Sequence, residues 1–323
     1  MLILTRDDIR KVLDVSELFE AMENGFRMLA QGRVQAPLRT TIDMKEFDGV
    51  SLFMPAYCTG LSAAGVKLVT VMSRNPEKGL PLIHSNYLFV SAETGQVLSL
   101  MDAEVLTSLR TAVASAVATS HVGKDGGRVL AIFGTGVQAW EHVQVFTKLF
   151  GIREVLVFGL TPELSEEFAV RIERQLRVPA KRAILAELKR AEILCTCTTN
   201  TEPLFELQDL HPAAHINAMG AYRPHTREIG TDVVTAAVVI VDSYAGALNE
   251  AGEFVIPIRE GKFRKEQIHA SIEELVAGVR PAPETAGKLT LFKSLGMALE
   301  DLVAADLAYR KAKEKGIGLE VRV

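Results

Sequence analysis

Apolar residues along the second half of the chain change repeatedly between two spacings, and this pattern predicts strands that alternate with helices. Short apolar runs typical of buried strands occur at 129–133, 155–158, 182–185, 193–196, 215–219 and 238–241. Between several of these runs the apolar residues recur at helical spacing, and Thr161-Pro162 is typical of a helix N-cap followed by the first helical residue. The alternation predicts an α/β fold with a mostly parallel, doubly wound sheet and helices on both faces.

The N-terminal part of the chain has a different pattern, in which several strands follow one another. We expect strands near 38–44, 50–55, 64–71, 83–90 and 97–101, flanked by helices at 15–31 and 105–119. After a strand at 289–293, a helix from Gly296 to about Lys315 carries an apolar stripe and is expected to return to the N-terminal part. The sequence therefore predicts a doubly wound domain at 123–293 and a discontinuous α+β domain made of 1–122 and 294–323.

Composition and charge exclude several classes of partner. The 323 residues are 48% hydrophobic, and 40 acidic against 36 basic residues give a formal net charge of −4, so no basic excess favours nucleic acid. The first ten residues are rich in charge and have no secretory signal, and the longest apolar run, Val233–Val241, is too short to cross a bilayer. We expect a cytoplasmic protein without nucleic-acid or membrane partners.

Cysteine and histidine residues give no sign of a metal site. Cys195 and Cys197 alternate as in a buried strand, and no nearby pair of Cys or His residues would complete a zinc site with them. We expect both residues and Cys58 to be free thiols, and we expect no metal.

The stretch from Arg128 to Ala139, Arg-Val-Leu-Ala-Ile-Phe-Gly-Thr-Gly-Val-Gln-Ala, joins a strand to a helix through two glycines. Gly134 permits a tight turn, and Gly136 lets a ligand come close to the backbone. The free N–H groups and the positive dipole end of the following helix suit a pyrophosphate. The stretch predicts a dinucleotide site, although an ordinary strand-turn-helix unit is the alternative.

Further motifs extend along almost the whole chain. They are Asn75-Pro-Glu-Lys-Gly79-Leu-Pro81, Ser91-Ala-Glu-Thr-Gly95, Met101-Asp102, Leu106-Thr-Ser-Leu-Arg110-Thr-Ala-Val-Ala-Ser115-Ala, His215-Ile-Asn-Ala-Met-Gly220-Ala and Phe292-Lys-Ser-Leu-Gly296-Met-Ala-Leu-Glu-Asp301. Together with the glycine turn, these motifs resemble the ornithine cyclodeaminase/mu-crystallin family in collinear order.

The resemblance implies a homodimer in which a substrate and dimerisation domain is joined to a Rossmann domain that holds a nicotinamide cofactor. It also implies a small α-amino or α-imino acid substrate, because the family includes ornithine cyclodeaminase, archaeal alanine dehydrogenase, ketimine reductases and Δ1-pyrroline-2-carboxylate reductases. We expect two chains to associate through the N-terminal strands, whose edges would otherwise stay unpaired.

The resemblance also carries a set of site residues onto this sequence. Lys67 and Arg110 match catalytic positions, and both match substrate-binding positions together with Arg39 and Met54. The positions that match cofactor-binding residues are Thr111, Gly134, Thr135, Gly136, Val137, Gln138, Thr161, Thr198, Met219, Gly220, Ser294, Leu295 and Gly296.

The basic residues of this set suit the carboxylate of an α-imino acid. Arginine holds a carboxylate through two parallel hydrogen bonds, while lysine supplies a movable point charge. On a strand, Lys67 faces away from its neighbours Val66 and Leu68. The alternative for Arg39 is an exposed strand residue, and the alternative for Arg110 is a salt bridge between the domains.

One departure from the family pattern bears on the reaction. The cyclodeaminases and the archaeal alanine dehydrogenase have an aspartate where this chain has Tyr222, within Gly220-Ala221-Tyr222-Arg223-Pro224. Cyclisation of ornithine needs a base, and a tyrosine is a poor base at neutral pH. Reduction of an imine requires only that the iminium be held and kept protonated. The sequence therefore favours a reductase.

The end of the second strand of the doubly wound domain bears on the coenzyme. An acidic residue at this point binds the ribose 2′-hydroxyl of NAD, and this chain has Gly159 there. Thr161 and the first N–H groups of the next helix are candidates to bind a 2′-phosphate, whereas Glu163 adds negative charge. The sequence favours NADP(H), with NAD(H) as the alternative.

The leading hypothesis is an NAD(P)H-dependent reductase that converts Δ1-pyrroline-2-carboxylate or Δ1-piperideine-2-carboxylate to L-proline or L-pipecolate. The alternatives are an ornithine cyclodeaminase, an alanine-type amino-acid dehydrogenase and a mu-crystallin-like binding protein. Retention of Lys67, Arg110 and the glycine turn argues against a degenerate site. Ring size stays open, because one methylene in an apolar pocket is worth only ~1–3 kcal/mol.

Overall fold

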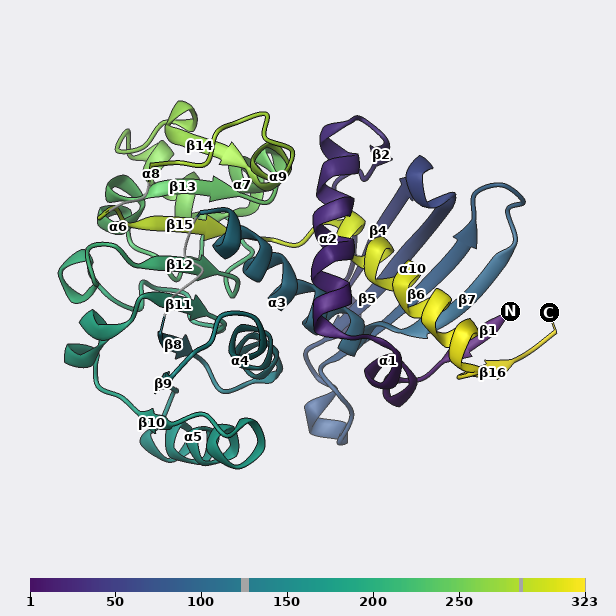
Figure 1. Ribbon diagram of the computed structural model, residues 1–323, viewed down its shortest axis with the longest axis horizontal. Coiled ribbons are helices and arrows are strands. Elements are labelled where there is room, and N and C mark those ends of the chain that lie inside the picture. The colour runs from purple at the N-terminus through teal and green to yellow at the C-terminus, as the bar shows by residue number, and fades with distance from the viewer. Residues whose placement is uncertain (123–127, 285–286, 323) are drawn as a thin grey trace. The chain divides into compact units, whose positions relative to one another are not determined.

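The computed structural model describes residues 1–122, 128–284 and 287–322, which divide into two compact units. Unit 1 comprises Met1–Thr111 and Met297–Val323, and unit 2 comprises Ala112–Gly296, so both ends of the chain belong to unit 1 (Figure 1). The division falls inside helix α3 (Ala103–His121), whereas the boundary expected from the sequence lies after that helix.

Unit 1 is built on a mixed sheet with the strand order β16-β1-β7-β6-β5-β4-β2, in which β3 also pairs with β4. Strands β4 to β7 form an antiparallel meander, and β1 joins β7 in parallel. Its strands are β1 (Leu2–Leu4), β2 (Val34–Gln35), β3 (Thr40–Met44), β4 (Gly49–Cys58), β5 (Ala63–Met72), β6 (Ile83–Ser91), β7 (Val97–Asp102) and β16 (Leu319–Glu320). Its helices are α1 (Arg6–Val12), α2 (Val15–Ala30) and α10 (Ala298–Lys315).

Helix α10 covers one face of this sheet. It packs against β4, β5 and β6, and α1 and α2 pack against α10 in turn (Figure 1). The register places Met54, Lys67, Tyr87 and Met101 opposite one another on four successive strands, and all four side chains are buried. Directly paired residues point to the same face of a sheet. Lys67 is therefore buried in a row with three large side chains, those of Met54, Tyr87 and Met101.

Unit 2 is a fully parallel sheet with the strand order β10-β9-β8-β11-β12-β15-β13-β14. Its strands are β8 (Val129–Phe133), β9 (Glu154–Phe158), β10 (Ala180–Arg182), β11 (Ile193–Thr196), β12 (His215–Ala218), β13 (Val238–Val241), β14 (Ile268–Ser271) and β15 (Thr290–Lys293). Its helices, apart from its share of α3, are α4 (Val137–Leu149), α5 (Pro162–Leu176), α6 (Thr231–Ala236), α7 (Tyr244–Glu250), α8 (Gly252–Arg259) and α9 (Ile272–Val276).

The strand order reverses direction at β8. The chain moves from β8 to β9 and β10 on one side, and then returns to β11 and β12 on the other. Since parallel crossovers are right-handed, the helices of the two halves cover opposite faces of the sheet, which confirms the predicted doubly wound fold. The gap between β8 and β11 is the topological switch point, where such sheets bind their ligands.

Most predicted elements are present, but one prediction was wrong. The strand expected at 182–185 ends at Arg182 as β10, and Leu185–Arg190 forms a short 3₁₀ helix. The apolar run misled the prediction because Ile184 and Leu185 are exposed, whereas Leu188 alone in that helix is buried. The thiols of Cys58, Cys195 and Cys197 are free, as expected.

Candidate functional site

The segments that follow six strands of unit 2 lie along one edge of its sheet, which we call the carboxyl edge. Strands β9, β8, β11, β12, β15 and β13 end in register there. These segments contain all the expected cofactor residues except Thr111: Gly134, Thr135, Gly136, Val137, Gln138, Thr161, Thr198, Met219, Gly220, Ser294, Leu295 and Gly296. The fold thus gathers residues that are far apart in the sequence.

The turn after β8 allows close approach to the backbone. Gly134 has a φ of +103°, and a Cβ there would lie 2.6 Å from the carbonyl oxygen of Cys197. Only glycine fits this position. Gly136 is the N-cap of α4; a Cβ on it would meet no atom within 4 Å, and no side chain caps the helix. The first N–H groups of α4 are therefore left for an anion such as a pyrophosphate.

Thr161 is the N-cap of α5, as predicted. Its Oγ1 accepts a hydrogen bond from Leu164 N at 3.3 Å, and Pro162 follows as the first helical residue. Hydrogen bonds from the backbone N–H of Glu163 and from the Thr161 hydroxyl lower the pKa of Glu163. The hydroxyl expected to bind a 2′-phosphate is therefore already bound to an acidic neighbour.

Gly159 is closely packed at the end of β9. A Cβ on it would lie 2.7 Å from Ser165 Oγ and 2.9 Å from Thr135 Cγ2, and Gly159 N donates to Ser165 Oγ at 2.8 Å. A side chain at position 159 would therefore require the side chains of Ser165 and Thr135 to shift. The next residue, Leu160, is 93% exposed and is the open position at this strand end.

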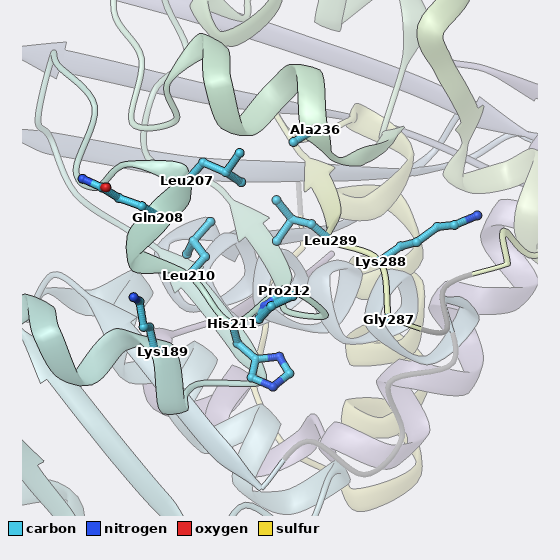
Figure 2. Close-up of a pocket in the computed structure, with 10 residues that line it drawn as sticks. All are labelled: Lys189, Leu207, Gln208, Leu210, His211, Pro212, Ala236, Gly287, Lys288 and Leu289. Carbon is cyan, nitrogen blue, oxygen red and sulfur yellow. The ribbon is translucent and has the colours of Figure 1, made fainter.

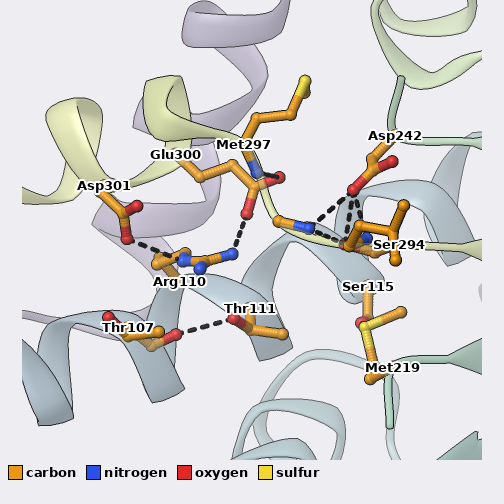
Figure 3. A network of polar contacts seen from close by, with 12 residues as sticks. Thr107, Arg110, Thr111, Ser115, Met219, Asp242, Ser294, Met297, Glu300 and Asp301 are labelled. Carbon is orange, nitrogen blue, oxygen red and sulfur yellow. Dashed lines mark hydrogen bonds and ion pairs between the residues drawn. The ribbon is translucent and has the colours of Figure 1, made fainter. Parts of the chain in front are cut away.

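Asp242 fixes the Ser294–Gly296 segment. Its buried carboxylate accepts hydrogen bonds from Leu295 N, from Gly296 N at 2.8 Å and from Ser294 Oγ at 3.1 Å (Figure 3). Burial raises the pKa of Asp242 although these bonds oppose the shift. The sequence analysis did not select Asp242 as a site residue. The feature that could have pointed to it is its position directly after the longest apolar run.

His142 joins α4 to α3 inside unit 2. Its Nε2 lies 2.9 Å from Ser115 Oγ and its Nδ1 lies 2.7 Å from Gln138 O, while Ser115 Oγ lies 3.3 Å from Met219 Sδ. Burial lowers the pKa of His142 to about 4, so the imidazole is neutral at neutral pH. The histidine supports the first turn of α4 without adding charge.

In unit 1 two bases and two acids form one buried network. Lys67 Nζ lies 2.9 Å from Asp301 Oδ1 and 2.8 Å from Oδ2. Arg110 donates from Nε to Asp301 Oδ1 at 3.0 Å and from Nη1 to Glu300 Oε2 (Figure 3). The side chains of Lys67, Arg110, Glu300 and Asp301 are 2%, 5%, 0% and 0% exposed. With all four ionised, the formal charges cancel.

The two bases of this network differ in their titration. Burial, opposed by Asp301 and reinforced by the neighbouring Arg110, lowers the pKa of Lys67 to about 8. Burial also disfavours charge on Arg110, but Asp301 and Glu300 outweigh it and raise the pKa of Arg110. Arg110 is therefore a permanent cation, and Lys67 can gain or lose a proton near neutral pH.

The remaining substrate residues take different positions. Met54 is buried opposite Lys67 in the β4–β5 register, and Arg39 is half-buried in the segment before β3. The alternative of a salt bridge between domains does not hold for Arg110, because its partners Glu300 and Asp301 belong to unit 1. Thr111 donates to Thr107 O at 2.8 Å along α3.

Three acidic or aromatic members of the surroundings of Lys67 were not expected. Glu300 and Asp301 are the last two residues of the motif that begins at Phe292, and this motif was the sequence feature that pointed to them. Tyr87 is buried opposite Lys67, and its hydroxyl has no hydrogen-bond partner among the residues that the structure describes. Burial, reinforced by Asp301, raises the pKa of Tyr87 well above its usual value.

A pocket of about 570 Å³ lies at the other end of the unit 2 strands (Figure 2). Residues that precede β12 and β15, such as Pro212 and Leu289, line it together with Leu207, Leu210 and Ala236. It contains none of the expected site residues. Within the described ranges no group of His, Cys, Asp or Glu side chains is arranged to hold a metal ion, and no helix is long and apolar enough to cross a membrane.

A parallel sheet with a glycine turn at its switch point, joined to a second unit with a buried lysine-arginine network, defines a two-domain protein of the Rossmann type. A model of the ornithine cyclodeaminase/mu-crystallin family matches residues 1–316. The chain belongs to the ornithine cyclodeaminase/mu-crystallin family, as the sequence motifs predicted.

Three relatives illustrate this membership. The chain is 36% identical to the ketimine reductase mu-crystallin of Rattus norvegicus over 310 residues, which covers 95% of this chain and 96% of the relative. The structure of Thermococcus litoralis Δ1-pyrroline-2-carboxylate reductase, in complex with NADH and L-proline, has a TM-score of 0.94 and 35% identity, and the match covers 99% and 100% of the two chains. An archaeal alanine dehydrogenase dimer with bound NAD has a TM-score of 0.93 and 29% identity, with 100% and 99% covered.

Proposed function

We propose that the protein is an NAD(P)H-dependent reductase of small cyclic α-imino acids, such as Δ1-pyrroline-2-carboxylate and Δ1-piperideine-2-carboxylate, with L-proline and L-pipecolate as products. The observation that carries this proposal is the buried network in which a titratable Lys67 stands beside a permanently charged Arg110. The relatives named as ketimine reductase and Δ1-pyrroline-2-carboxylate reductase support the same reaction.

Unit 2 supplies the coenzyme site in this proposal. The free N–H groups after Gly136, together with the open space beside that glycine, fit a pyrophosphate held by Gly134–Gln138. Thr161 belongs near the adenosine ribose, while Thr111, Thr198, Met219, Gly220 and Ser294–Gly296 complete the set. When bound, the reduced nicotinamide supplies a hydride to the imine carbon.

Unit 1 supplies the substrate residues. Asp301 and Glu300 bind Nε and Nη1 of Arg110, which orients the guanidinium and leaves the donors of Nη2 for the substrate carboxylate, with help from Arg39. Lys67 in its protonated form keeps the imine nitrogen protonated. Because the charges of the network cancel, an iminium carboxylate with no net charge enters without adding net charge to a buried site.

Tyr222 separates this reaction from ornithine cyclisation. This tyrosine stands where the cyclodeaminases have an aspartate; its side chain is 47% exposed, and the guanidinium of Arg223 lies 5.6 Å from its ring. The carboxylate base that the cyclodeaminases use at this position to activate the ornithine amine is therefore replaced by a phenol. An assay of NADPH and NADH oxidation with five- and six-membered cyclic imines tests the proposal, and failure to oxidise either coenzyme would refute it.

We propose that NADPH is preferred over NADH, because the end of β9 carries no carboxylate. The crowding at Gly159 makes Leu160 the better position for a test. Leu160→Arg is expected to raise the NADPH/NADH ratio of kcat/KM by about tenfold, since one charge-assisted hydrogen bond is worth ~1.5–3 kcal/mol. Leu160→Asp should lower the ratio by a similar factor. Unchanged ratios in both variants would show that the 2′-phosphate does not bind at this strand end.

We also propose a homodimer formed by the uncovered face and edge of the unit 1 sheet. Large apolar side chains are exposed there, among them Ile42 at 52% and Leu68 at 37%. The relative described as an alanine dehydrogenase dimer supports this assembly. Sedimentation at micromolar concentration should show a dimer that Leu68→Lys weakens; a stable wild-type monomer would contradict the proposal.

A further inference from the structure

Glu228 is a fully buried acid that binds two separate segments of the carboxyl edge. Its Oε1 accepts hydrogen bonds from Thr198 N at 2.8 Å and from Thr198 Oγ1 at 2.7 Å. Its Oε2 accepts from Thr196 Oγ1 at 2.8 Å and from Gly220 N at 2.7 Å. One carboxylate therefore holds the end of β11, the segment after it and the segment after β12.

The two segments are held in very close contact. A Cβ on Gly220 would lie 2.1 Å from the carbonyl oxygen of Thr198 and 2.5 Å from Glu228 Oε1. Only glycine therefore fits at position 220, and it lets the two segments lie this close. The four hydrogen bonds to Glu228 oppose a shift of the segments apart.

Glu228 is itself fixed by a second buried acid and a buried base. Glu228 N donates to Glu253 Oε1 at 3.1 Å, and Glu253 Oε2 lies 3.2 Å from Lys293 Nζ. The Lys293 ammonium also donates to Ala221 O at 2.6 Å, next to Gly220. Glu228, Glu253 and Lys293 are all 0% exposed. The network thus extends from β11 and β12 to the end of β15.

This half of the sheet is the one expected to hold the nicotinamide. In a doubly wound sheet the glycine turn and the strands on its side bind the adenosine half, and the strands beyond the switch point bind the other half. Burial of a carboxylate is costly, and an apolar side chain would fill the space at less expense in free energy. We therefore relate the buried acid to the geometry of the two segments that are expected to hold the reactive end of the coenzyme.

We propose that Glu228 is a positioning residue, which sets the geometry for hydride transfer by fixing the Thr198 and Gly220 segments, and does not set coenzyme affinity. This inference rests on the reductase function proposed above. It predicts that loss of the carboxylate changes kcat far more than it changes coenzyme binding, because a small misplacement of reacting atoms costs up to about 10²-fold in rate.

Glu228→Gln tests the proposal with almost no change in volume. Each carboxylate oxygen accepts one backbone N–H, so the amide NH₂ of glutamine faces an N–H in either orientation. We expect kcat to fall about 10- to 100-fold, with a larger primary isotope effect from coenzyme deuterated at C4. The Kd of NADPH, measured by its fluorescence, should change by less than about threefold, which is under ~0.7 kcal/mol.

A second readout needs neither coenzyme nor substrate. Amide hydrogen exchange at Thr198 and Gly220 should accelerate in Glu228→Gln, because at least one of these N–H groups loses its acceptor. Faster exchange in a protein without imine reductase activity would support the role of Glu228 in holding these two segments and refute the proposed function. Unchanged exchange at both amides would refute the role of Glu228 in holding the two segments, whatever the activity.

Thr290→Val is the matched control for lost stability. It removes a buried hydroxyl that lies 2.8 Å from His215 Nδ1, where β15 and β12 begin at the opposite end of the sheet. This variant should lower Tm to a similar extent while kcat and the isotope effect stay at wild-type values. If Glu228→Gln lowers kcat no more than Thr290→Val does, or weakens coenzyme binding in proportion to kcat, the positioning role is refuted.

Discussion

Replacement of Arg110 by alanine is expected to lower kcat/KM for a cyclic α-imino acid on the order of 10³-fold, with a higher KM and a lower kcat. The substrate carboxylate loses two charge-assisted hydrogen bonds at ~1.5–3 kcal/mol each, and every ~1.4 kcal/mol is a factor of ten. The same contacts set the angle at which the hydride reaches the imine carbon, so kcat falls as well. Steady-state kinetics with either ring size measures both constants.

Two further variants separate this effect from misfolding. Arg110→Ala leaves Glu300 and Asp301 buried with one cation fewer, which costs about 3–5 kcal/mol of stability when a buried pair is broken. Arg110→Lys keeps the charge and removes the planar fork, so it should still raise KM. Added guanidinium ion should partly restore the kcat/KM of the Arg110→Ala variant. Arg6→Ala, which removes an exposed pair with Glu104, should leave the kinetics unchanged; a wild-type KM in Arg110→Lys would contradict the account.

The kcat/KM of the wild-type enzyme is expected to fall tenfold per pH unit above about 8, because Lys67 must be protonated and its pKa is about 8. Burial lowers this pKa from the usual value of 10.5. Lys67 is therefore almost fully protonated well below pH 8 and loses its proton as the pH rises through this value. Lys67→Ala should remove this limb of the profile and lower kcat if the lysine protonates the imine. If the lysine only binds the carboxylate, the variant should mainly raise KM.

Asp301 provides the test of the cause of this limb. Its negative charge favours protonated Lys67, so Asp301→Asn should move the limb to lower pH. Asp306→Asn is the control on the same helix, because Asp306 is mostly buried and pairs with Arg310 outside the network. A limb that stays in place in Asp301→Asn, or that moves equally in both variants, would show that another group, such as the substrate imine, titrates there.

The fold was largely predictable because its signals are local. The buried runs at 129–133, 193–196 and 238–241 match strands at both ends, and the Thr161-Pro162 start of α5 is as expected. Short elements such as β1 and β16 were not predicted, since two or three residues give no recognisable period and depend on pairing with distant strands.

The site was predictable only in part, because its contacts are not local. Lys67 and Asp301 are 234 positions apart in the sequence, and no spacing rule joins them. Glu228, between Arg227 and Ile229, reads as an ordinary surface acid until the sheet buries it. The packing around Gly159 was likewise hidden, since the sequence suggested only a missing charge, whereas Ser165 and Thr135 also crowd the position where a side chain would stand.

The most direct test of the reductase assignment compares two reactions in one preparation. Oxidation of NADPH and NADH is followed with Δ1-pyrroline-2-carboxylate and Δ1-piperideine-2-carboxylate, and ammonia release is followed with ornithine and NAD. The account predicts coenzyme oxidation with at least one imine, formation of L-proline or L-pipecolate, and no ammonia from ornithine, because Tyr222 replaces the acid that cyclisation needs. Robust ammonia release from ornithine without imine reduction would contradict the account and assign the protein as a cyclodeaminase.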